Sequence, residues 1–340
     1  MKRKILGVLK YVFFLGIGFF LVWWQFNKMT AIQKFQFGES LRYGNYWLLV
    51  PIIILALLSH ISRAVRWKIL MEPMGYRPST SNTFYSVMCG YLVNTFLPRV
   101  GEVVKCTLLN RYEKIPTNKL IGTILVERAF DLVCYLLLIL ITILIQIRQV
   151  SSFLRKKLSE MESHGNIPIW VKLLFIAALI FLLARFVKWI FKKFERHPHI
   201  ISVKGFHIGI KEGFGSIIRL KNRGWFIFHT LFIWSMYLLE IFIGFSALSA
   251  TAHLGFTEAC SVLSLATLGM IVSPGGIGAF PLAVQEVLLI YHVDNVSFGW
   301  IIWGVSTGII LLGGLISFGL LVYNNKKTNE AKQTNSAQNI

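Results

Sequence analysis

One apolar run, over residues 257–292, is interrupted at its centre by Ser273-Pro274-Gly275-Gly276-Ile277-Gly278-Ala279-Phe280-Pro281. Proline lacks a backbone N–H and glycine is conformationally free, so this stretch cannot continue a helix. Each remaining arm has roughly 16 residues and reaches ~24 Å, less than the ~30 Å hydrocarbon core of a bilayer. Interrupted backbone at membrane depth is tolerated only inside protein or beside water. Two interpretations remain open: a re-entrant helical hairpin that builds a polar cavity, or a loop between two short spans.

The composition indicates a polytopic, all-α membrane protein. Of 340 residues, 55% are hydrophobic and 15% are charged, and the mean hydropathy is +0.62. A soluble core does not need this much apolar sequence. We expect about six full spans, near residues 5–24, 46–61, 118–147, 169–191, 224–250 and 296–323. We expect a loop over residues 25–45, a basic linker with a short surface helix over 192–223, and a disordered polar tail over 324–340.

A second apolar segment is also interrupted. It begins near Asn82, stops at Pro98-Arg99-Val100-Gly101-Glu102 and resumes as an amphipathic piece to about Lys114. With this second hairpin the membrane domain, residues 1–323, divides into halves of about 1–147 and 169–323. Each half has three spans and one hairpin, and three is odd, so the halves have inverted topology. Interrupted segments at matching positions of two inverted halves are typical of a transporter's central site.

The net charge of +20 predicts which side of the membrane each loop faces. Basic residues concentrate on the cytoplasmic side of membrane proteins and contact anionic headgroups. If the N-terminus is cytoplasmic and both hairpins re-enter, the cytoplasmic segments contain many more Lys and Arg residues than the outer loops after the first and third expected spans. We therefore expect both termini and the 324–340 tail in the cytoplasm. Met1-Lys2-Arg3-Lys4 precedes about 20 apolar residues without a small-residue cleavage site, so we expect an uncleaved first span. No soluble basic domain is long enough to bind nucleic acid.

Three charged residues lie inside the expected third span: Glu127, Arg128 and Asp131. Each charge near the centre of a bilayer costs about 2.5–3.5 kcal/mol. Arg128 and Asp131 are three residues apart on a helix and can pair, and Glu127 shares a face with Asp131. The group is either an internal ion pair that holds helices together, or a charged cavity wall that contacts a lipid headgroup or a coupling ion.

Further polar candidates lie at the ends and centres of apolar segments. The tip of the first hairpin and its restart contain Asn94, Pro98, Arg99, Gly101, Glu102 and Lys105. A helix N-terminus with added cations suits a phosphate, although an arginine there can also extend to the membrane interface. Arg63 and Arg66, at the inner end of the second span, allow the same two interpretations. Glu240 and Glu286 are isolated acids that either bind a proton or ion or form structural hydrogen bonds.

Enzyme signatures are missing from the sequence. There is no HExxH and no GxSxG, and the glycine-rich turn does not follow a soluble strand. His197-Pro198-His199 lies in the basic linker, and the four cysteines lie singly. We therefore expect no catalytic residue, metal or cofactor.

Four motifs occur in a fixed order: Arg63-x-x-Arg66-Trp67, Asn94-x-x-x-Pro98-Arg99-x-Gly101-Glu102-x-x-Lys105, Glu127-Arg128-x-x-Asp131 and Pro274-Gly275-Gly276-Ile277-Gly278. Over about residues 5–325 the chain resembles the lysylphosphatidylglycerol synthase transmembrane, or flippase-like, family. The resemblance implies a multi-pass protein of a bacterial or archaeal plasma membrane, whose relatives translocate an aminoacylated phospholipid between leaflets. Those relatives carry a separate aminoacyl-transferase domain, and only a short tail follows Tyr323 here, so we expect no synthase activity. Many members have a charged residue after the glycine-rich turn, where this chain has Phe280-Pro281.

We therefore expect a translocase for an anionic phospholipid or an isoprenoid-linked precursor in the bacterial plasma membrane. Phosphate would meet Arg99, Lys105 and Arg128. Glu102, Glu127 and Asp131 would set the charge or couple ions, and Gly275, Gly276 and Gly278 would let backbone approach lipid phosphate or the facing hairpin. The alternatives are a membrane-embedded transferase that uses a lipid carrier and an accessory subunit of a lipid or glycan enzyme. The expected partners are membrane lipids, with a second copy or a glycosyltransferase as candidates.

Overall fold

The computed structural model describes residues 16–146 and 220–338, and the regular secondary structure in these ranges is helical. This confirms an all-α polytopic membrane protein. Residues 16–28 form a first helix. The labelled helices are α2 (Ala31–Tyr43), α3 (Leu49–Met71), α4 (Thr80–Phe96), α5 (Val100–Glu113), α6 (Thr117–Ile145), α10 (Arg223–Phe245), α11 (Phe256–Val272), α12 (Ala279–Ile290) and α13 (Ser297–Gln338). Short 3₁₀ turns occur at η1 (Tyr46–Leu48), η2 (Glu72–Met74) and η3 (Pro274–Gly276).

Four stretches among the described residues are long and apolar enough to cross a membrane: Tyr46–Met74, Thr117–Ile145, Arg223–Phe245 and Ser297–Lys326. They agree with four of the expected spans. The expected span over 169–191 lies outside the described residues, as does most of the basic linker over 192–223. Of the first expected span, only the part from residue 16 onward is described.

Three expectations about element boundaries are wrong. The second span does not end near residue 61, because α3 contains no Gly or Pro between Ile52 and Met71 and continues to Met71. The expected loop after the first span contains α2, whose start is fixed by reciprocal hydrogen bonds between Thr30 and Gln33. The tail is not disordered up to Gln338, because α13 continues into it without a helix-breaking Gly or Pro.

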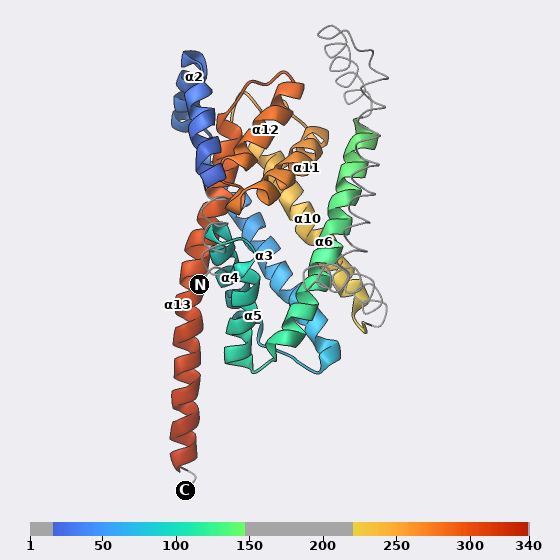
Figure 1. The fold of residues 1–340 in the computed structure, drawn as a ribbon, viewed down its shortest axis with the longest axis vertical. Coiled ribbons are helices and arrows are strands. Elements are labelled where there is room, and N and C mark those ends of the chain that lie inside the picture. Colours follow the sequence, from blue (N-terminus) through green and yellow to red (C-terminus); the bar gives the residue numbers. More distant parts are fainter. Residues whose placement is uncertain (1–15, 147–219, 339–340) are drawn as a thin grey trace, which may run out of the picture.

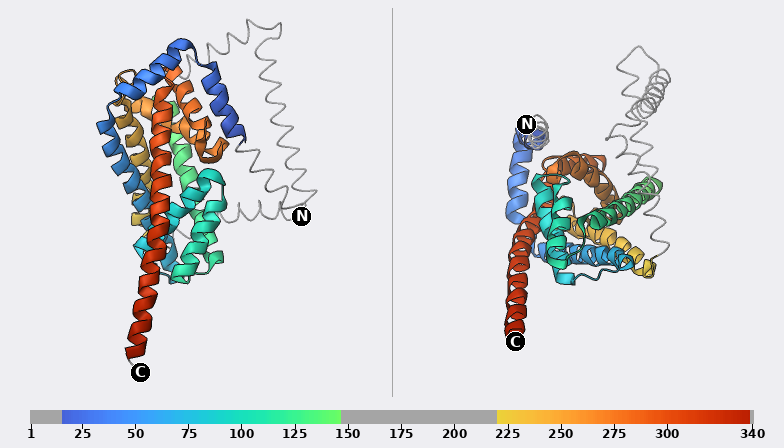
Figure 2. Two further views of the ribbon diagram at one scale, coloured as in Figure 1. Left: turned by 90° about the vertical axis from the view of Figure 1, so that its left-hand side faces the viewer. Right: turned by 60° about the horizontal axis from the view of Figure 1, so that its bottom comes forward.

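Two helical hairpins occupy opposite ends of the bundle (Figure 1). The first hairpin, α4–α5, lies in the lower half of the view, and the second hairpin, α11–η3–α12, lies in the upper half. The left view of Figure 2 shows the same order along the long axis. Helices α3 and α10 run antiparallel through both halves and pack along each other. The bundle is therefore two hairpin units joined by long helices.

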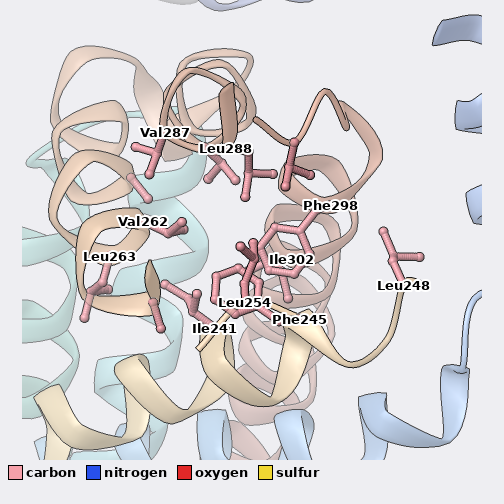
Figure 3. Packing of buried hydrophobic residues seen from close by; sticks show 14 of the residues in the cluster. Ile241, Phe245, Leu248, Leu254, Val262, Leu263, Val287, Leu288, Phe298 and Ile302 are labelled. Atoms are coloured by element: carbon pink, nitrogen blue, oxygen red, sulfur yellow. The ribbon is translucent and has the colours of Figure 1, made fainter. Parts of the chain in front are cut away.

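Each hairpin has a hydrophobic core of its own. The upper core joins α11, α12 and α13 to the end of α10 through residues such as Phe245, Val262 and Phe298 (Figure 3). The lower core joins α3, α4, α5 and α6 to the beginning of α10 and includes Trp67 and Phe226. These fully buried side chains remove large apolar areas from solvent or lipid and fix where each hairpin lies.

Glycines let the two arms of each hairpin approach closely. A Cβ atom at Gly101 would lie 1.9 Å from the carbonyl oxygen of Gly90 in the facing arm. A Cβ atom at Gly269 would lie 2.7 Å from the carbonyl oxygen of Ala279 in the second hairpin. The arms therefore meet backbone to backbone at these points, which only glycine permits.

The two hairpin tips are in contact. A Cβ atom at Gly275, in η3, would lie 3.0 Å from the carbonyl oxygen of Thr95, near the end of α4. Trp303 of α13 donates a hydrogen bond from Nε1 to the Gly275 carbonyl oxygen at 2.8 Å. Gly278 packs instead against the backbone of Gly18 in the first helix. The two chain interruptions are thus adjacent in space, although about 175 residues separate them in the sequence.

Candidate functional site

Beside the first hairpin, Glu127 of α6 accepts hydrogen bonds from four cations. Its Oε1 atom lies 3.2 Å from the guanidinium groups of Arg63, Arg66 and Arg128, and its Oε2 atom lies 3.0 Å from Lys105 Nζ. The side chain of Glu127 is 0% exposed. A carboxylate buried so completely needs several charge-assisted hydrogen bonds to offset its lost hydration.

Asp131 lies one helical turn further along α6 and pairs with three of these four cations. Its Oδ2 atom lies 3.0 Å from Arg63 Nη1, and its Oδ1 atom lies 2.8 Å from Arg66 Nη2. Arg128 Nη2 lies 3.5 Å from Asp131 Oδ2, so the predicted pairing of Arg128 with Asp131 is confirmed. The spacing of four residues places both carboxylates on one face of α6, opposite the arginines of α3.

Seven residues form one ionic cluster: Arg63, Arg66, Glu102, Lys105, Glu127, Arg128 and Asp131. As ionised groups they comprise four cations and three carboxylates, an excess of one positive charge. The outer edge of the cluster is the pair Arg128 Nε–Glu102 Oε1, at 3.6 Å, whose side chains are 38% and 28% exposed. The cluster is therefore buried on the α3 side and accessible at Arg128.

Neighbouring polar and aromatic groups hold the cations in place. Arg63 Nη2 donates to the Tyr237 hydroxyl oxygen at 3.1 Å, and Arg66 Nη1 donates to Thr230 Oγ1 at 3.2 Å, both on α10. Lys105 Nζ lies 4.6 Å from the centre of the Trp67 ring. Trp67 is itself fixed by a hydrogen bond from Nε1 to Thr123 Oγ1. Hydrogen bonds and a cation–π contact thus orient these cations inside the protein.

The structure changes the interpretation of Arg63 and Arg66. They are not at the end of the second span but within the second half of α3, about two turns before its end at Met71, and their side chains pair with Glu127 and Asp131. The expectation that they extend to the membrane interface is therefore wrong, because α3 is longer than the sequence indicated. Lys105, expected to meet phosphate, is 3% exposed and bound to Glu127.

The other predicted site residues lie outside the ionic cluster. Arg99 is exposed at the first hairpin tip, and Asn94 Oδ1 accepts a hydrogen bond from the Gly101 backbone N–H at 2.8 Å, which closes that hairpin. Glu240 is buried in α10, and its Oε1 atom has no hydrogen-bond partner within the described ranges. Glu286 is exposed on α12. The three glycines contact protein: Gly275 meets Thr95, Gly276 meets Met270, and Gly278 meets the first helix.

Sequence reasoning missed the α10 partners of the cluster. Thr230 and Tyr237 are seven residues apart, and this spacing of two helical turns places them on one face of a mostly apolar helix. This spacing was the sequence feature from which the two partners could have been predicted. Tyr91 of α4 was missed as well, because one tyrosine in an apolar segment is not distinctive. Its ring centre lies 5.9 Å from Arg63 Cζ.

The fold and the ionic cluster define an integral membrane protein with a buried charged site beside two apposed hairpins. The chain belongs to the family described as the lysylphosphatidylglycerol synthase TM region, whose model matches residues 8–312. It is also 23% identical over 336 residues to the UPF0104 membrane protein MJ1595 of Methanocaldococcus jannaschii, covering 93% of this chain and 91% of that protein. No solved structure matches the chain significantly. Family membership agrees with the resemblance carried by the four motifs.

Proposed function

We propose that this protein translocates a lipid with an anionic headgroup across the plasma membrane and leaves the lipid chemically unchanged. The observation that carries the proposal is the excess of one positive charge in a cluster that lies between membrane-length helices and the first hairpin. Charges at this depth are costly, and in membrane proteins they mark substrate or ion pathways. The family description, which names a phospholipid synthase, supports a phospholipid as the substrate class.

In this proposal the exposed edge of the cluster receives the headgroup. Arg128 is the most accessible of the cluster's cations, and its guanidinium suits a phosphate geometrically. Arg63, Arg66 and Lys105 remain bound to Glu127 and maintain the positive excess. Arg99, exposed at the tip of the first hairpin, is the first cation that a headgroup meets.

The contact between the hairpin tips divides the path. One hairpin enters from each end of the bundle, and Thr95 meets Gly275 where they end. A headgroup that crosses must pass this contact, so the tips separate during translocation. This arrangement resembles the broken segments at the shared interface of inverted-repeat transporters.

Translocation is tested in vesicles that contain the purified protein and a trace of phosphatidylglycerol with a fluorescent acyl chain. Dithionite quenches the fluorophores in the outer leaflet, and the loss of the protected fraction measures transfer between leaflets. We expect transfer in wild-type vesicles and at least tenfold slower transfer with Arg128→Gln, because one charge-assisted phosphate contact is worth ~1.5–3 kcal/mol. Lys114→Gln, an exposed charge change at the far end of α5, is the matched control.

If the fraction of fluorescence protected from dithionite equals that in protein-free vesicles, the proposal is contradicted. Chromatography of the recovered lipid separates translocation from the alternative of a membrane-embedded transferase. A new lipid product that forms only with the protein would favour the transferase, and unchanged lipid is the expected result.

A further inference from the structure

Several buried hydrogen-bonding atoms at the ionic cluster have no hydrogen-bond partner in the described part of the chain, Arg66 Nε and Arg128 Nε among them. Three others, His60 Nδ1, Arg63 Nε and Tyr91 OH, belong to neighbouring residues at one edge of the cluster. They come from two helices and lie together. His60 and Arg63 are one turn apart on α3, and the His60 and Tyr91 rings are 5.3 Å apart between centres. Arg63 Cζ lies 5.9 Å from the centre of the Tyr91 ring.

Unpaired buried polar atoms are uncommon, because each has lost its hydrogen bonds to water. Three of them on residues that contact one another, with His60 only 8% exposed and Arg63 only 7% exposed, favour a place where a further polar group binds. Arg63 connects this place to the ionic cluster, since its Nη1 atom binds both Glu127 and Asp131. Arg63 therefore belongs to both places.

The hydrogen-bonding roles of the three atoms limit which kind of polar group can bind to all of them. Arg63 Nε is a donor only, whereas the Tyr91 hydroxyl and a histidine ring nitrogen can each donate or accept. A group that both accepts and donates satisfies all of them, and a hydroxyl does so. An ammonium group does not fit, because it would lie beside the positive charge of Arg63.

We propose that His60, Arg63 and Tyr91 bind a hydroxyl group of the substrate's headgroup, with Tyr91 as a specificity-determining residue. The substrate class is then a phosphodiester lipid whose headgroup is a polyol, such as glycerol or a sugar. The inference rests on the proposed function in that the phosphate of the same headgroup meets the ionic cluster.

The test compares two lipids of equal charge that differ in headgroup hydroxyls. Native mass spectrometry of the full chain in detergent measures the binding of short-chain phosphatidylglycerol and short-chain phosphatidylethanol. We expect wild type to bind phosphatidylglycerol roughly five- to tenfold more tightly, the range that one or two hydrogen bonds supply. Tyr91→Phe should weaken phosphatidylglycerol to the level of phosphatidylethanol and leave phosphatidylethanol unchanged.

Tyr135→Phe is the matched control, because the Tyr135 hydroxyl is bound to the Ser264 carbonyl oxygen on α11 and is not part of the cluster. It should keep the preference for phosphatidylglycerol. If Tyr91→Phe does not fold, His60→Phe removes Nδ1 and retains the aromatic ring, and the same loss of preference is expected. Equal binding of both lipids by wild type, or a preference that survives the Tyr91 and His60 changes, overturns the inference.

Binding and translocation separate this inference from the proposed function. If wild type prefers phosphatidylglycerol through Tyr91 but transfers no lipid in vesicles, the binding inference stands and the translocase proposal fails. If wild type transfers both lipids and binds them equally, the translocase proposal stands and the inference fails, because the unpaired atoms then bind water only.

Discussion

At the scale of single residues, Glu127 holds the ionic cluster together. It is the carboxylate that contacts Arg63, Arg66, Lys105 and Arg128, and it is fully buried. Without its charge, the buried cations would face one another with Asp131 as their remaining close carboxylate. Uncompensated charges in a region of low dielectric constant are strongly destabilising, more so than the loss of an exposed ion pair.

We predict that Glu127→Gln lowers the free energy of unfolding by about 3–5 kcal/mol, the usual consequence of removing one partner of a buried ion pair. Unfolding in mixed micelles by increasing dodecyl sulfate, followed by circular dichroism, measures this. Glu286→Gln, the same change at an exposed position on α12, should have almost no effect. Equal stability of Glu127→Gln and wild type would show that water reaches the cluster.

Arg99 combines a strained backbone with an exposed charge. Its φ of 69° lies in the left-handed region, where a residue with a side chain is about 1–2 kcal/mol less stable than in the right-handed region. We predict that Arg99→Gly stabilises the protein by up to about 1 kcal/mol and at the same time slows lipid transfer. Loss of the charge, rather than of the fold, would explain the slower transfer.

The control is Lys114→Gly at the other end of α5. Lys114 has a φ of 61°, so glycine relieves the same strain there. It should stabilise the protein similarly and leave the transfer rate unchanged. If Arg99→Gly transfers lipid as fast as wild type, Arg99 has no role in headgroup capture.

The sequence allowed the acidic half of the cluster to be predicted, because charged residues inside an apolar helix are conspicuous. Helical spacing also showed that Glu127 and Asp131 share a face. It could not show which helix faces them, since periodicity describes one helix at a time. Arg63 and Arg66 were recognised as candidates but were misplaced, because their partners are more than 60 residues away.

At the scale of elements, both hairpins follow from local chemistry. Proline and glycine interrupt each apolar run, and α4, α5, α11 and α12 begin and end close to the predicted boundaries. The errors have a different origin. The end of α3 and the tail of α13 were judged by polarity, but a polar stretch without Gly or Pro can remain helical when its helix is already formed.

The backbone contact between the arms of the first hairpin gives a prediction at this scale. Gly101→Ala places a Cβ atom 1.9 Å from the Gly90 carbonyl oxygen and 2.7 Å from the Asn94 side chain. The arms must separate, and we predict a loss of more than about 2 kcal/mol of stability, in the range of severe overpacking. The same detergent unfolding experiment measures it.

Gly122→Ala is the companion change, because a Cβ atom at Gly122 on α6 meets no atom within 4 Å. Alanine should stabilise that helix by about 0.5–1 kcal/mol through its better helix propensity. If both alanine variants have the same stability, the close packing of the hairpin arms is not important for folding.

At the scale of the whole molecule, the two ends of the bundle differ in charge. The lower end in Figure 1 is formed by the end of α3, the end of α5, the beginning of α6, the beginning of α10 and the C-terminal part of α13. The basic residues in these described segments and their connections include Lys68, Arg77, Arg111, Lys114, Lys119, Lys221, Arg223 and Lys326. The described connections and short helix of the upper end carry Lys28, Lys34 and Arg42. Since basic residues accumulate on the cytoplasmic side, we infer that the lower end, with the C-terminal part of α13, faces the cytoplasm.

This orientation predicts the result of cysteine labelling in intact cells. In a variant with the four native cysteines replaced, His253→Cys, exposed between α10 and α11, should react with an impermeant maleimide. Lys114→Cys, exposed at the lower end, should react only after the membrane is permeabilised. The reverse pattern would invert the molecule in the membrane and remove the support that loop charge gives to the proposed orientation.

The account depends most on the claim that a headgroup passes between the two hairpin tips. A cysteine-free protein with Thr95→Cys and Gly275→Cys can be cross-linked at the tip contact by mild oxidation in the vesicles used for lipid transfer. Oxidised and reduced samples of the same variant share any strain caused by the substitutions. Transfer is followed here by extracting the fluorescent lipid of the outer leaflet onto albumin, because dithionite would itself reduce the disulfide. We predict that oxidation reduces phosphatidylglycerol transfer to the rate of protein-free vesicles and that a reductant restores it. Transfer by the cross-linked protein at the rate of the reduced protein would contradict the account.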